Sequence, residues 1–230
     1  MILHNGQSLN GYSAAGDHTW QIENIPAPID WLTQNDQLLF TVGGDQPALY
    51  RLDPSGVITP VAPLSGQLAA AADQLFVYGS TALYQLSPTP TLLKQIDRVV
   101  YNDGSLIATS DGGLIISHHG INGIRLIALR ADGSQRWERS LQPLTRSAPQ
   151  LVAIRDEVYA VTAEGDMWWI DQRSGAAQRV LDGTRLNNLP GPVRAFTTSH
   201  GTLIVDFRGG RIVALDPHVA VVADEVDDRP

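Results

Sequence analysis

The sequence predicts an all-β protein: a β-propeller of about five four-stranded blades, preceded by an incomplete N-terminal blade. A polar turn followed by an apolar, β-rich run recurs at residues 36, 73, 111, 156 and 200, a period of 37 to 45 residues. A glycine-bearing turn and a second apolar run follow each copy. No window of about 11 residues carries a helical apolar stripe. Four strands in each of several repeats of this length are typical of a propeller.

Each repeat predicts its four strands in chain order. The first is a short apolar stretch such as 151–154, and the second follows the polar turn, as in 157–161. The third follows a glycine-bearing hairpin turn, as in 212–215, because glycine permits the positive φ of tight turns. The fourth follows a further turn, as in 53–56. We expect a single domain over 1–230, with a partial blade at 1–24, blades at 28–62, 66–97, 104–142, 148–183 and 191–223, and an acidic tail at 224–230.

The N-terminal blade is expected to have three strands rather than four. Residues 13–20 align with residues 130–137, and both segments end in tryptophan. Met1 to His4 then becomes the second strand, and the innermost strand is missing. Because an unpaired edge recruits other strands, we expect an open ring or a chain cut from a longer one. The alternative is that Val219 to Val222, with the charged tail, closes the ring.

Composition excludes several chemistries. The chain has no cysteine, which removes disulfides, thiolate zinc sites and thiol nucleophiles. Its net charge of −8, with Lys94 as the single lysine, opposes nucleic-acid binding. No apolar run reaches the roughly 18 residues of a membrane span, and residues 1–6 carry no signal peptide. We expect a soluble chain of unknown compartment, extracytoplasmic if it is part of a longer protein.

Residues 126–137 carry a family resemblance. A small residue and leucine, an Asp-bearing turn with glycine, and then Trp137 resemble the repeat of pyrroloquinoline-quinone-like propellers, the quinoprotein-like, WD-like class. Residues 171–175 and 214–216 match this repeat in part. The resemblance implies a propeller in which Trp137 and Trp20 pack between blades. The family's quinone enzymes are associated with larger rings, a cysteine pair and a calcium site, so we expect no cofactor here.

The propeller topology places two groups of polar residues at one end of the blades. Six residues before each polar turn, a polar side chain begins the strand expected to line the channel. A ring of such groups suits water, an ion or a small polar ligand, but a single carboxylate argues against a metal. The candidate ligand-binding residues of the channel mouth are Asp30, Gln67, Ser105, Gln150 and Arg194. The turns after second strands add Asp45, His118, His119, Asn122, Glu164, Asp166, Arg208 and Arg211 to the same face.

Three features of these strands and turns have two interpretations. Adjacent His118 and His119 point to opposite faces if extended and cannot share a metal, so we expect an exposed loop pair. Residues 208–211 form either a guanidinium clamp for a carboxylate or phosphate, or a solvated Gly-Gly turn. Trp168 and Trp169 place one indole on each face of a strand, for packing between blades or for stacking on a sugar or partner.

No catalytic residue is predicted. The sequence has no nucleophile elbow, zinc-protease motif, phosphate loop or dinucleotide fingerprint. We therefore expect a non-catalytic scaffold or binding module that presents a loop-built face to a protein partner. The alternatives are a propeller hydrolase or lyase acting on a sugar or lactone through Asp30, Gln150 and Arg194, and a small-ligand sensor.

Overall fold

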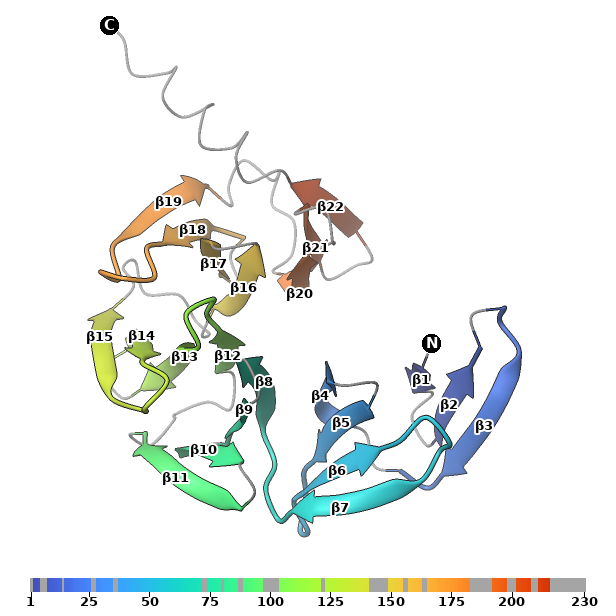
Figure 1. Ribbon diagram of the computed structural model, residues 1–230. Coiled ribbons are helices and arrows are strands. Elements are labelled where there is room, and N and C mark those ends of the chain that lie inside the picture. The colour runs from blue at the N-terminus through green and yellow to red at the C-terminus, as the bar shows by residue number, and fades with distance from the viewer. Residues whose placement is uncertain are drawn as a thin grey trace, which may run out of the picture. The chain divides into compact units, whose positions relative to one another are not determined.

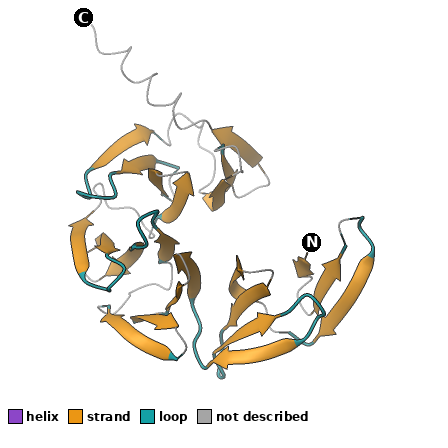
Figure 2. Cartoon of the chain, in the orientation of Figure 1, coloured by secondary structure: helices purple, strands orange, loops and turns teal. Residues whose placement is uncertain are grey.

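The computed structural model describes most of the chain as strands and turns (Figure 1). The described residues are 2–4, 8–13, 15–25, 28–34, 37–71, 74–79, 81–86, 89–96, 104–120, 123–140, 149–154, 157–162, 165–182, 192–197, 202–207 and 211–215. They form β-strands and no helix (Figure 2), so among them nothing helical is available to span a membrane. Two compact units divide the chain, residues 1–96 and 97–230.

The first unit contains three antiparallel sheets whose strands are neighbours in chain order. The first sheet has three strands and the second and third have four each. The first comprises β1 (Ile2–His4), β2 (Ser8–Tyr12) and β3 (His18–Glu23); the second comprises β4 (Pro28–Gln34), β5 (Gln37–Val42), β6 (Ala48–Leu52) and β7 (Ile58–Ala62); the third comprises β8 (Gln67–Ala71), β9 (Gln74–Tyr78), β10 (Ala82–Leu86) and β11 (Pro90–Gln95).

The second unit repeats this arrangement. The fourth sheet comprises β12 (Ser105–Ala108), β13 (Leu114–Gly120), β14 (Gly123–Leu129) and β15 (Gln135–Ser140); the fifth comprises β16 (Gln150–Ile154), β17 (Glu157–Val161), β18 (Met167–Ile170) and β19 (Ala177–Leu181). The sixth shows β20 (Pro192–Thr197), β21 (Leu203–Phe207) and β22 (Arg211–Leu215), and the fourth strand expected after it lies outside the described residues.

Burial follows the order of the strands in each sheet. The second strands β5, β9 and β17 are buried along nearly their whole length, which explains why their sequences are continuously apolar rather than alternating. The fourth strands β3, β11 and β15 are mostly exposed or half-buried, and β3 and β15 consist mostly of polar residues. The sheets whose second and fourth strands are both described therefore have a buried inner part and a solvated outer strand, as propeller blades do.

Successive sheets within each unit bury their apolar faces against one another. One cluster joins the first and second sheets through residues that include Leu9 and Phe40, and another joins the second and third through Leu49 and Leu68. In the second unit, equivalent clusters join the fourth sheet to the fifth and the fifth to the sixth. The first strands lie side by side, β4 with β8 in one unit and β16 with β12 and β20 in the other.

The predicted all-β propeller class is confirmed at the level of its blades. The N-terminal sheet has three strands, with Ile2–His4 paired to β2, as the alignment of residues 13–20 with 130–137 predicts. Trp168 packs against the core between the fourth and fifth sheets, and Trp169 packs against the core between the fifth and sixth. Of the two interpretations of this pair, packing between blades is the one that the structure supports.

Candidate functional site

Asp30, the carboxylate of the predicted channel mouth, bonds to the neighbouring sheet. It lies on β4, and its Oδ2 accepts a hydrogen bond of 2.8 Å from the backbone N–H of Leu68 on β8. Thr41 lies opposite Asp30 in the β4–β5 ladder, and its hydroxyl donates to the carbonyl of Gly66 at 2.5 Å. Two side chains of one sheet therefore hold the backbone that enters the first strand of the next.

Ser105 makes the same contact in the second unit. Its Oγ accepts a hydrogen bond of 3.0 Å from the backbone N–H of Leu151 on β16. Ser117 is its cross-strand partner, is fully buried, and donates to the carbonyl of Pro149 at 2.6 Å. Because both contacts join equivalent positions, Asp30 and Ser105 are sheet-to-sheet acceptors in addition to being candidates for the channel mouth.

Burial raises the pKa of the Asp30 carboxyl, against the opposing effect of two backbone donors, Leu68 and Trp31. The Trp31 N–H donates to Oδ1 at 2.9 Å and the Leu68 N–H to Oδ2. A raised carboxyl pKa is a property of general acids. Here both oxygens are engaged by backbone N–H groups, which is the environment of a structural acceptor.

The other predicted mouth residues occupy corresponding places. Gln67 and Gln150 are half-buried and begin β8 and β16, each directly before the leucine that donates to the preceding sheet. Arg194 lies in β20, opposite Asp206 in the backbone ladder. Within each unit the structure brings these positions together on adjacent first strands. The complete five-residue ring stays a prediction.

The predicted loop residues have different environments. Asp45 is exposed in the β5–β6 turn, while Asp166 is half-buried, with Oδ2 4.0 Å from the Arg179 guanidinium. Arg211 begins β22. Asn122, Glu164 and Arg208 lie outside the described residues, so the guanidinium clamp stays a prediction. Over the described part of the chain, no three acidic or histidine side chains gather as a metal site.

The expectation of an exposed histidine pair is wrong for His118. That residue lies within β13 and is 2% exposed, whereas His119 is half-buried. The hairpin β13–β14 continues to Gly120 and Gly123, so both histidines belong to strand rather than to turn. The turn starts later than expected because the apolar run of β14 reaches back to Ile124, which pairs with His119.

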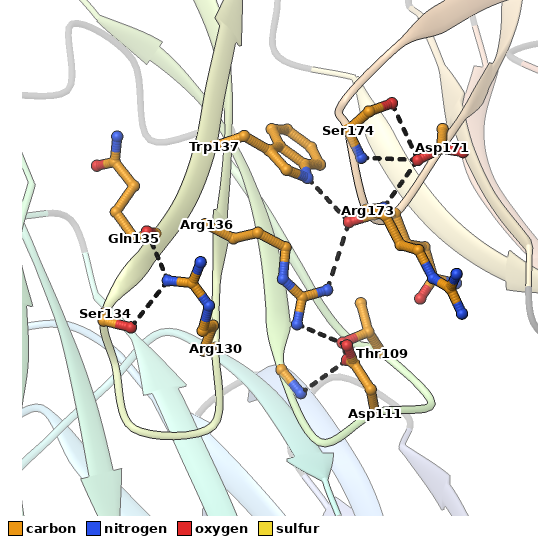
Figure 3. A network of polar contacts seen from close by, with 12 residues as sticks. Thr109, Asp111, Arg130, Ser134, Gln135, Arg136, Trp137, Asp171, Arg173 and Ser174 are labelled. Atoms are coloured by element: carbon orange, nitrogen blue, oxygen red, sulfur yellow. Dashed lines mark hydrogen bonds and ion pairs between the residues drawn. The ribbon is translucent and has the colours of Figure 1, made fainter.

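A polar network joins the fourth and fifth sheets (Figure 3). The Trp137 Nε1–H donates to the Gln172 carbonyl at 2.8 Å, and the indole is 7% exposed. Arg136 pairs with Asp111 at 2.5 Å and also donates to the Gln172 carbonyl at 3.4 Å. A Cβ added to Gly175 falls 2.6 Å from the Trp137 ring, so glycine lets the indole lie flat on the turn of the next sheet.

Trp20 makes the matching contact in the first unit. Its ring lies against the β6–β7 turn of the second sheet, where a Cβ on Gly56 falls 3.1 Å from the ring. The prediction that Trp20 and Trp137 pack between blades is confirmed. Sequence reasoning missed Thr41, Ser117 and the Asp111–Arg136 pair. The recurring hydroxyl in second strands was the available signal for the first two.

The comparisons with known proteins agree with this architecture. A family model described as "Outer membrane protein assembly factor BamB" matches residues 5–225. The search of curated proteins gave no match. Among solved structures, BamB from Moraxella catarrhalis is similar with a TM-score of 0.59 and 14% identity, over 93% of this chain and 65% of that one. This chain therefore spans less than two thirds of that protein.

Two further solved structures share the fold. A protein of unknown function from Bacteroides thetaiotaomicron has a TM-score of 0.60 and 13% identity, over 92% of this chain and 58% of that one. A luciferin-regenerating enzyme has a TM-score of 0.55 and 17% identity, over 82% of this chain and 71% of that one. The family model matches residues 5–225, and the repeat and the docking tryptophans agree with it. The chain therefore belongs to the BamB family of pyrroloquinoline-quinone-like propellers.

Proposed function

We propose that this chain is a non-catalytic scaffold or binding module that presents a loop-built face to a protein partner. The observation that carries the proposal is that two polar residues of the predicted mouth make structural hydrogen bonds between sheets. Asp30 and Ser105 accept backbone hydrogen bonds from the next sheet and so hold blades together. The same contacts argue against a sugar or lactone hydrolase, in which Asp30 must be available to substrate.

The family description supports a protein as the partner. An outer membrane protein assembly factor acts on other proteins, and rigid blades with exposed turns suit that role, since binding residues concentrate on loops held by a scaffold. The face proposed to bind is the one formed by turns after second strands. In the first unit, Asp45 is a suitable position to test on this face, because the turn 44–47 is exposed along its whole length.

Site-specific photocrosslinking in cells that produce the full chain tests this proposal. A photoreactive residue at Asp45 is compared with one at Pro54, an exposed residue of the β6–β7 turn at the opposite end of the same sheet. We expect one discrete protein adduct from position 45 and none from position 54. Equal adducts from both positions, or none from position 45, would contradict the loop-built face.

A thermal-shift screen addresses the enzyme and sensor alternatives. Sugars, lactones and divalent cations are expected to leave the melting temperature unchanged, because a ligand that binds only the folded protein raises it. If a ligand raised the melting temperature of the wild type but not that of a folded Asp30→Ala variant, the mouth would be a ligand-binding or catalytic site and the scaffold proposal would be wrong.

A further inference from the structure

The turn between β18 and β19 of the fifth sheet carries two exposed arginines. This turn, residues 171–176, lies at the end of the sheet opposite the turns after second strands. Arg173 belongs to the turn, and its side chain extends away from the docked indole (Figure 3). Arg139 comes from β15 of the fourth sheet and donates to the Ser174 carbonyl at 3.3 Å. We call the exposed side chains of Arg139 and Arg173 the arginine surface.

Most hydrogen-bond donors of the arginine surface remain available. Among the described residues, the Arg173 guanidinium makes no hydrogen bond, and the Arg139 guanidinium makes only the bond to Ser174. The carboxylate beside Arg173 is that of Asp171, and its Oδ1 already accepts three donors from Arg173 N–H and from the N–H and hydroxyl of Ser174. Because each guanidinium has five N–H donors, both arginines can bind a further acceptor from outside the chain.

The matching interface of the first unit shows that docking between sheets does not require these arginines. The tryptophan of β3 packs on the turn 53–56 as that of β15 packs on the turn 171–176. Two residues after the tryptophan, β3 has Ile22 where β15 has Arg139. The turn 53–56 contains no arginine. Contact between consecutive sheets therefore leaves the arginine surface without an assigned role.

We propose that the arginine surface binds an acidic segment of a protein partner through the carboxylates of that segment. Guanidinium groups bind carboxylates bidentately, and arginine is enriched in protein interfaces. The surface lies at the other end of the sheets from the loop-built face, so the proposal goes beyond that face and does not depend on it.

The surrounding charges favour a peptide over a phosphate polymer or an anionic membrane. Asp171 lies in the same turn as Arg173, and Glu138 precedes Arg139. These carboxylates, together with the net charge of −8, repel a continuous row of phosphates. The side chains of a peptide can instead be spaced so that its carboxylates meet the two arginines alone.

Fluorescence anisotropy of a labelled peptide, in which glutamate alternates with serine, tests the proposal on the full chain. We expect saturable binding at low ionic strength that weakens as salt is added. Arg139→Gln and Arg173→Gln should each weaken binding about threefold, as expected for an exposed ion pair, and together about tenfold. Arg51→Gln is the matched control, because Arg51 is exposed on β6 of the second sheet and the change in net charge is the same.

Arg173→Gln separates binding from folding, because its guanidinium makes no hydrogen bond among the described residues. Its melting temperature should equal that of the wild type. The proposal is overturned if the peptide shows no saturable binding at millimolar concentration, or if Arg51→Gln weakens binding as much as Arg173→Gln. Binding to phosphatidylglycerol vesicles but not to the peptide, lost in Arg173→Gln, would also overturn it and assign the surface to a membrane.

Discussion

Asp30 joins two sheets through one carboxylate, and this gives a pH-dependent prediction at the scale of the residue. Its oxygens accept the N–H groups of Trp31 and Leu68, while burial raises its pKa. A carboxyl whose pKa is raised by folding contributes stability that is present below the unfolded pKa of about 3.9 and lost as pH rises through the folded pKa.

Asp30→Asn removes this titration and keeps one acceptor oxygen. The free energy of unfolding of the wild type should therefore increase relative to Asp30→Asn as pH falls from 7 to 4. Urea unfolding of both proteins across this range measures the difference. A difference that is constant with pH, or that changes in the opposite direction, would show that Asp30 is not the buried acceptor described.

Gly175 provides a second prediction at this scale, with Gly16 as its matched control. Both glycines have positive φ, 72° and 90°, in turns between third and fourth strands. A Cβ on Gly16 has open space, whereas one on Gly175 falls 2.6 Å from Trp137. Gly16→Ala should cost about 1 kcal/mol from φ alone, and Gly175→Ala about 1–3 kcal/mol more because the added Cβ clashes with the Trp137 ring. If denaturant unfolding gave the same loss of unfolding free energy for both variants, Trp137 would not dock on the turn that contains Gly175.

At the scale of the element, aspartates rigidify the turns that connect the strands. The Asp171 Oδ1 accepts the N–H groups of Arg173 and Ser174 at 2.9 and 2.7 Å, and the Asp53 Oδ1 accepts those of Ser55 and Val57 at 2.9 and 3.0 Å. These bonds hold the turn and stabilise the ionised carboxylate. Hydrogen bonding, led by the side chain of Ser55 for Asp53 and the backbone N–H of Ser174 for Asp171, lowers both pKa values.

The lowered pKa values predict acid sensitivity of the turns. A carboxyl with a depressed folded pKa contributes stability above its unfolded pKa of about 3.9 and loses it as pH falls through the folded value. The melting temperature should fall between pH 5 and pH 2, and Asp171→Asn should make that fall shallower. If Asp171→Asn had the same pH profile as the wild type, the turn carboxylate would not be the group that titrates.

The turns and the tryptophans were predictable from the sequence, and the polar contacts between sheets were not. Glycine at a positive φ and an aspartate that accepts its own backbone are local signals, which is why the aligned segments 13–20 and 130–137 located the turn and the docking residue. Asp30 and Ser105 were recognised as equivalent, but a polar residue at the start of a strand does not reveal whether it faces solvent or a neighbour's backbone. Arg136 and Asp111 are 25 residues apart, and no local pattern joins them.

At the scale of the whole molecule, each sheet buries an apolar face that it cannot hide alone. The described clusters all join two consecutive sheets of one unit. Stability in such a chain is a sum of sheet and nearest-neighbour terms. A destabilising substitution at one interface should therefore lower the stability of both sheets that form it and affect more distant sheets less.

Hydrogen exchange of Trp137→Phe measures this mutual dependence most directly. The change removes the Nε1–H donor to the Gln172 carbonyl, which keeps its contact with Arg136, and the lost hydrogen bond should cost about 0.5–1.5 kcal/mol. The account predicts that amide protection falls by similar factors, about tenfold for each 1.4 kcal/mol, in β13 of the fourth sheet and in β17 of the fifth. Loss of protection confined to β15, with β17 unchanged, would contradict it.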